Sequence, residues 1–149
     1  MRVSVATSQT AALARRLVMD EAHGLDRPEA VMEAGERAWG RLRRRLITLI
    51  GPEGCDALFA RALALSRSDY PILAGVHYEA ATEYGLTGLR EIIHESAPTD
   101  VLDALVTVTT YFLAVLARLI GADLVVRLVR EAWPELPPED VQISGETNE

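Results

Sequence analysis

Residues 28–62 read PEAVMEAGERAWGRLRRRLITLIGPEGCDALFARA, and residues 98–132 read PTDVLDALVTVTTYFLAVLARLIGADLVVRLVREA. At a constant offset of seventy positions, the two segments share identical residues at both ends and at several places between. A segment that recurs at a fixed offset is typical of one supersecondary unit used twice. The sequence therefore predicts an internally duplicated helical hairpin. The identical pairs are Pro28/Pro98, Val31/Val101, Ala34/Ala104, Leu46/Leu116, Leu49/Leu119, Ile50/Ile120, Gly51/Gly121, Leu58/Leu128 and Ala62/Ala132.

A chance origin is the alternative to duplication, because two amphipathic helices rich in alanine and leucine tend to agree at apolar positions. Chance accounts well for the matched leucines. It accounts less well for a proline at one end of both segments together with Leu-Ile-Gly at a matched distance. We therefore favour duplication.

The periodicity of apolar residues predicts helices along nearly the whole chain. In the first copy they recur at steps of three and four, which indicates an amphipathic helix from Pro28 to Ile50. Gly51 is expected to end this helix and Pro52 to begin the next, which reaches about Ser68. We predict an all-α, five- to six-helix bundle. Further helices are expected at about 8–22, 86–95, 100–120 and 122–133, while 70–85 is left unassigned apart from a possible extended piece at 76–78.

The length of 149 residues fits one domain, and we place it at residues 1–133. From Pro134 onward the sequence has two adjacent prolines, several acidic residues and little apolar surface to bury. Such a composition does not offset the entropy cost of ordering a chain. We therefore predict that residues 134–149 form a flexible acidic tail.

Composition excludes several classes of function. All fifteen basic residues are arginine, so no chemistry that needs a lysine amine is possible. The net charge of −7 argues against a dedicated nucleic-acid binder. One cysteine, Cys55, excludes an intramolecular disulfide and fits a reducing cytoplasm. The uncharged stretch 104–117 is too short to cross a bilayer, and the first residues lack a secretory signal. We expect a bacterial, cytoplasmic protein, since arginine without lysine is typical of GC-rich coding sequences.

The search for a catalytic centre is mostly negative. The sequence has no nucleophile elbow, no glycine-rich phosphate loop and no dinucleotide fingerprint. Cys55 has two acidic neighbours, Glu53 and Asp56, which disfavour the thiolate form of a reactive cysteine. We therefore expect a chemically inert thiol and no cofactor.

One short string resembles a metal-binding pattern. Glu91 and His94 stand three residues apart, which places both side chains on one face of a helix, as in carboxylate-bridged di-metal sites. Such sites need two of these motifs, and this chain has one. A mononuclear site could form if His77, Glu79 and Glu83 joined them. The alternative is a solvated helix end before Pro98, where a histidine complements the helix dipole, and we favour it.

A basic stretch offers the best candidate for a partner-binding surface. Its residues fall on adjoining rows of the expected helix and surround an aromatic side chain, so they could meet an acidic protein. The alternative is a solvated face in which the arginines pair with Glu33 and Glu36 one turn back. The predicted partner-binding residues are Arg37, Trp39, Arg41, Arg44 and Arg45.

The last expected helix, 122–133, carries more apolar residues than one buried face needs. We predict that some of them form the interface of a homodimer, although burial within the same chain would also explain most of them. The predicted interface residues are Leu124, Val125, Leu128 and Trp133.

Together these observations predict a non-catalytic, adaptor-like regulatory protein that acts through a helix surface on a protein partner, without nucleic acid or membrane. The alternative is a metal- or small-ligand-binding helical bundle, a sensor or a carboxylate-metal enzyme, that uses Glu91 and His94. The two differ in whether purified protein carries bound metal.

Overall fold

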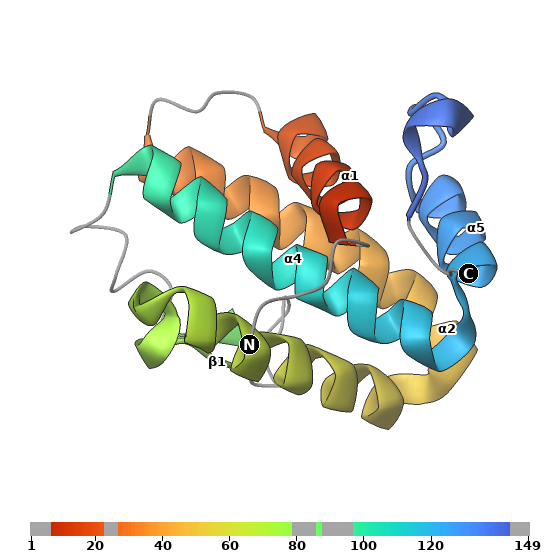
Figure 1. Ribbon diagram of the computed structural model, residues 1–149, viewed down its shortest axis with the longest axis horizontal. Helices are drawn as coiled ribbons and strands as arrows, with labels where there is room; N and C mark the ends of the chain where they lie inside the picture. The colour runs from red at the N-terminus through yellow and green to blue at the C-terminus, as the bar shows by residue number, and fades with distance from the viewer. Residues whose placement is uncertain (1–6, 23–26, 79–85, 88–96, 144–149) are drawn as a thin grey trace.

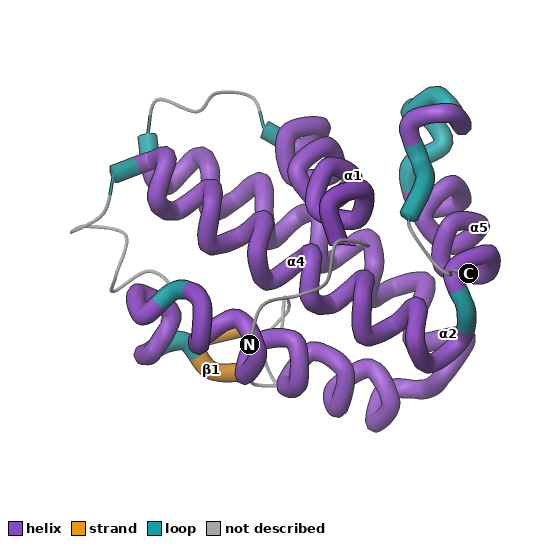
Figure 2. The backbone as a smooth tube through the Cα atoms, in the orientation of Figure 1, coloured by secondary structure: helices purple, strands orange, loops and turns teal. Residues whose placement is uncertain are grey.

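The computed structural model describes residues 7–22, 27–78, 86–87 and 97–143, and these residues are almost entirely helical (Figure 1, Figure 2). The all-α class is confirmed. The described part of the chain holds four α-helices, so the predicted count of five to six is not reached there. They are α1 (Thr7–Glu21), α2 (Pro28–Asp69), α4 (Pro98–Ile120) and α5 (Ala122–Ala132), with short 3-10 turns at η1 (Pro71–Gly75) and η2 (Pro138–Asp140).

The unassigned stretch after α2 contains a small strand pair. Strand β1 (His77–Tyr78) pairs antiparallel with β2 (Leu86–Thr87). The possible extended piece at 76–78 is thus confirmed. The helix expected at 86–95 does not begin at Leu86, because Leu86 and Thr87 pair with β1, and residues 88–95 lie outside the described part of the chain.

Two glycines at matched positions break the helices. Gly51 lies within α2 with φ 82° and ψ 163°, so α2 consists of two arms, 28–50 and 52–69. Gly121 separates α4 from α5 with φ 94° and ψ 146°. Side chains other than hydrogen rarely tolerate this backbone conformation, while a Cβ would have free space at both glycines. The predicted breaks at Gly51 and Gly121 are therefore confirmed. Glycine is favoured at both positions because of the positive φ, and lack of space for a side chain is not the reason.

The first arm of α2 and helix α4 lie side by side at the centre of the molecule and run in the same direction (Figure 1). A Cβ on Gly35 would lie 2.8 Å from Cδ1 of Leu105, so the backbone of α2 approaches α4 closely there. One turn later, Nε1 of Trp39 donates a hydrogen bond to Oγ1 of Thr109 at 2.9 Å. Both contacts join positions seventy residues apart. The two helices are therefore in register.

The remaining elements pack around this central pair. Helix α1 contacts both α2 and α4, while the second arm of α2 and helix α5 leave the pair at the same end in different directions (Figure 1). The rings of Phe59 and Phe112 stack at 4.2 Å between centroids, which joins the second arm to α4. Helix α4 is long and apolar enough to cross a membrane, but two thirds of its most apolar window is buried within the protein. That burial fits a core helix of a soluble protein.

The segment 134–143, here called the C-terminal strap, lies between α1 and α5 (Figure 1). Its apolar side chains Leu136, Val141 and Ile143 are buried in the hydrophobic core. The interpretation that residues after Pro134 have little to bury is therefore wrong for the strap. Three apolar side chains of the strap thus lie in the core, although acidic and proline residues dominate its composition. Residues 144–149 lie outside the described part of the chain.

Candidate functional site

The arginines of α2 point to the carboxyl-terminal ends of two other helices. Arg37 donates a hydrogen bond to the carbonyl oxygen of Glu21, the last residue of α1. Arg41 Nη1 donates to the carbonyl oxygen of Ala132, the last residue of α5, at 2.8 Å, and Arg45 Nη2 donates to that of Glu131 at 3.0 Å. The last carbonyl groups of a helix have no intrahelical partner and carry partial negative charge. The three arginines therefore cap α1 and α5.

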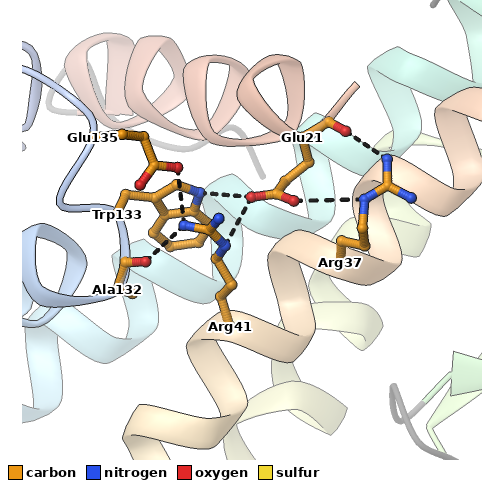
Figure 3. Close-up of polar contacts among 6 residues, drawn as sticks. All are labelled: Glu21, Arg37, Arg41, Ala132, Trp133 and Glu135. Atoms are coloured by element: carbon orange, nitrogen blue, oxygen red, sulfur yellow. Dashed lines mark hydrogen bonds and ion pairs between the residues drawn. The ribbon is translucent and has the colours of Figure 1, made fainter. Parts of the chain in front are cut away.

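The carboxylate of Glu21 is the centre of a buried network (Figure 3). The residue is only 8% exposed. One oxygen, Oε2, accepts a hydrogen bond from Trp133 Nε1 at 3.0 Å and forms an ion pair with Arg41 Nε at 2.9 Å. The other, Oε1, lies 3.5 Å from Arg37 Nε. A buried carboxylate is tolerated only when its charge and lone pairs find such partners.

Trp133 joins α5 to this network. Its ring is fully buried, and the guanidinium of Arg41 lies over it, 5.3 Å from the ring centroid. A cation over an aromatic face is attracted by the negative face of the ring. Arg41 thus contacts the end of α1, the end of α5 and Trp133 at once, so this residue ties three helices together.

The C-terminal strap adds Glu135 to the same region, where its Oε2 lies 3.0 Å from Arg41 Nη1. Burial and a hydrogen bond with Glu135 raise the pKa of Asp20 above its ordinary value. Burial pushes the pKa of Glu135 upward too, but its own backbone hydrogen bond, Asp20 and Arg41 together lower it. Asp20, Glu21 and Glu135 have carboxylate oxygens within 4.8 Å of one another. Arg37 and Arg41 supply the positive charge that this cluster needs.

Arg44 differs from its neighbours. Its side chain is exposed, and within the described residues no ion pair involves it. It lines a cavity of about 400 Å³ at the end of α5. Arg41, Arg45, Glu131, Ala132, Pro134 and Glu135 complete that lining.

Two groups of predicted site residues lie in the core. Trp39 is buried between α2 and α4, so it does not share a surface with the arginines. Val125, Leu128 and Trp133 are buried within the chain as well, because α5 lays its apolar face on the other helices and on the strap. These three residues are therefore unavailable to a second subunit, and only Leu124 remains half-buried.

The residues of the alternative metal site are not brought together by any described contact. His77 lies in β1, and the position of its side chain is not described. Glu79, Glu83, Glu91 and His94 lie outside the described residues. Cys55 is buried, and this burial raises the pKa of its thiol to about 11. The thiol is thus protonated at neutral pH, as expected of an inert cysteine.

Sequence reasoning missed Glu21, which organises the network. A signal was present: Glu21 follows Leu17 by four residues and Val18 by three, so it lies on the apolar stripe of α1. An acidic residue on such a stripe must find a buried partner.

Comparison with protein-family models, with curated proteins and with solved structures finds no match to this chain.

Proposed function

We propose that this chain is a non-catalytic helical interaction protein that binds an acidic segment of a partner protein through the arginine face of α2, defined as Arg37, Arg41, Arg44 and Arg45. The observation that carries the proposal is that this face already binds carboxylates of its own chain, from Glu21, Glu131 and Glu135. Arginine is well suited to this task because its planar guanidinium donates several hydrogen bonds at once. A bacterial cytoplasmic regulator or adaptor is the class of protein that we favour.

Arg44 allows a direct test, because its exposed side chain supports no described helix end. Arg44→Glu should abolish capture of the partner from extracts of the native host, and capture by the unaltered protein should weaken as salt rises. Arg61→Glu is the matched control, since Arg61 is exposed on the second arm of α2. Capture of the same proteins by both variants would contradict the proposal.

Metal or small-ligand binding is the weaker proposal. Asp20, Glu21 and Glu135 are the described residues whose oxygens lie close enough to share a cation. Two arginines compete with any such cation for Glu21. Stoichiometric metal in untagged protein purified without chelating resin would nevertheless reverse the ranking of the two functions.

We also propose that the protein forms a homodimer, through different residues from those that the sequence indicated. Leu49 and Leu119 are exposed by 45% and 62%, and both lie in the last turn before a glycine break, at the same end of the central pair (Figure 1). Contiguous exposed apolar patches mark association surfaces, and we propose that these two leucines belong to one. Light scattering at micromolar concentration should report a dimer, and Leu119→Glu a monomer. A monomeric unaltered protein at every concentration would contradict this proposal.

The internal duplication is likewise our proposal. Its support is the same unusual backbone conformation at Gly51 and Gly121 and the contacts between positions seventy apart, Gly35 with Leu105 and Trp39 with Thr109. Two copies of one hairpin that pack along a common pseudo-twofold axis would bring equivalent positions into contact in this way.

A further inference from the structure

The C-terminal strap is held on the body by side chains from three helices. Gln142 accepts a hydrogen bond from Gln9 of α1 at 3.0 Å, and Asp140 lies 3.4 Å from Arg16 of the same helix. Glu135 pairs with Arg41 of α2, and Arg130 of α5 donates to the carbonyl oxygen of Pro138 at 3.3 Å. We call Gln9, Arg16, Arg41 and Arg130, with the apolar core surface under the strap, the strap site.

The backbone of the strap contributes little to this attachment. Within the described residues its backbone-to-backbone hydrogen bonds are local, from Leu136 to Trp133, from Asp140 to Pro137 and from Val141 to Pro138. No described helix or strand ladder would therefore be interrupted if the strap left the body. Segments held in this way can open without global unfolding.

The strap and its site are complementary in charge and in shape. The strap contains Glu135, Glu139 and Asp140 and no basic residue, and its site presents three arginines. Near its end, Val141 and Ile143 are buried whereas Gln142 between them is exposed. The strap is not extended throughout, because the 3-10 turn η2 lies before this end. The strap site thus binds an acidic segment whose apolar side chains enter the core.

We propose that the C-terminal strap is an intramolecular competitor: it occupies in cis the site at which an acidic segment of a partner with buried apolar side chains binds, and the partner gains access when the strap is displaced. The inference deepens the proposed function, on which it rests for the existence of a partner. Arg41 belongs to both the arginine face and the strap site, so a partner that binds this face must share or take the position of Glu135. The strap would thereby set a threshold for binding, because only segments that outcompete it gain the site.

The first experiment measures opening of the strap in the full-length chain. Val141→Cys places a thiol of similar size in the strap, and native Cys55 in the core reports global unfolding in the same molecule. A chromogenic disulfide reagent should modify the introduced strap thiol at least about a hundredfold faster than Cys55, after each rate is divided by its rate in the denatured chain. The comparison also requires correction for the raised pKa of the Cys55 thiol. Equal corrected rates would overturn the proposal, since the strap would then open only when the protein unfolds.

A pair of adjacent arginines provides the control. Arg16→Gln removes an ion pair to the strap and should speed modification of the strap thiol about threefold or more, whereas Arg15→Gln removes an ion pair to Asp103 of α4 and should leave that rate unchanged. Equal effects of both substitutions would mean that the strap ion pair does not govern opening. Thermal unfolding followed by circular dichroism checks that each variant is folded.

The second experiment measures whether the strap site binds a separate peptide. A synthetic peptide with the sequence of residues 134–143 should raise the modification rate of the strap thiol in a saturable manner, because it competes with the strap for its site. A peptide with the same composition in scrambled order should have no effect. Absence of any rise would overturn the proposal and leave the arginine face untouched, which Arg44→Glu tests separately.

Discussion

The segments 28–62 and 98–132 follow the same pattern in their cores and differ on their surfaces. Leu46 and Leu116 are both fully buried, and Leu58 and Leu128 are both nearly so. Even the exposed positions agree, since Leu49 and Leu119 are both open to solvent. The two segments thus agree at these matched positions in exposure as well as in burial.

The difference lies in the arginine face. At the offset of seventy, Arg37, Arg41, Arg44 and Arg45 correspond to Thr107, Tyr111, Ala114 and Val115. The arginines meet the ends of α1 and α5 and the C-terminal strap, while α4 is enclosed by other helices on most of its surface. The buried apolar residues that the two segments share thus form the central pair of helices. The arginines that only the first segment carries determine where the peripheral elements attach.

The largest effect is expected from truncation of the matched core leucines. Leu46→Ala and Leu116→Ala should each lower the free energy of unfolding by about 2–5 kcal/mol, because both leave a cavity at a fully buried position. Arg127→Ala, at an exposed position of α5, should cost no more than about 0.5 kcal/mol. Chemical denaturation gives all three values. A small cost at one core position only would break the equivalence of the two halves.

Removal of the charge on Glu21 tests the arginine face of α2, which has no counterpart on α4. Glu21→Gln leaves Arg41 and Arg37 without their buried anion and should cost about 2–3 kcal/mol, less than for a fully buried pair because both arginines are partly exposed. The control is Glu33→Gln on the exposed side of α2. If both substitutions were equally mild, the network would not hold α1 and α5 to α2.

The glycine breaks should respond alike. Gly51→Ala and Gly121→Ala should each cost about 1–2 kcal/mol, since a Cβ has space at both positions but the backbone conformation is strained for alanine. Gly75→Ala also meets open space, without a positive φ, and should be nearly neutral. Thermal unfolding distinguishes the cases. A neutral result at Gly121 alone would show that the two breaks are not equivalent.

The fold was largely predictable because it depends on local signals. Apolar periodicity and the matched glycines identified α1, both arms of α2, α4 and α5 and their ends. The short strand pair was only a possibility in the sequence, since two-residue strands carry almost no pattern.

The site was predictable in part. The arginines of α2 were recognised as a distinctive face, but their partners are the carbonyl groups and carboxylates of segments far away in sequence. Trp39 was assigned to the arginine surface because Arg37 and Arg41 lie two residues away on either side, whereas its side chain is buried and donates a hydrogen bond to Thr109 of α4. Contacts between segments far apart in sequence produce no periodic pattern of residues, so they cannot be predicted from the sequence. The buried strap was missed for the same reason: three apolar residues among prolines and acids look like a tail.

The most direct test of the central pair is a double-mutant cycle across the hydrogen bond from Trp39 to Thr109, the contact between equivalent positions of the two halves. Trp39→Phe and Thr109→Val should show a coupling energy of about 1–2 kcal/mol in urea denaturation, because the double variant loses the hydrogen bond only once and Thr109→Val leaves the indole N–H of Trp39 buried and unpaired. The hydroxyl of Thr109 keeps its own hydrogen bond to the carbonyl oxygen of Leu105 when Trp39 is replaced. The control cycle pairs Trp39→Phe with Thr110→Val and should be additive. The hydroxyls of Thr109 and Thr110 each donate to the carbonyl oxygen four residues back, but Trp39 donates to Thr109. Additivity in both cycles would contradict the in-register packing of α2 on α4.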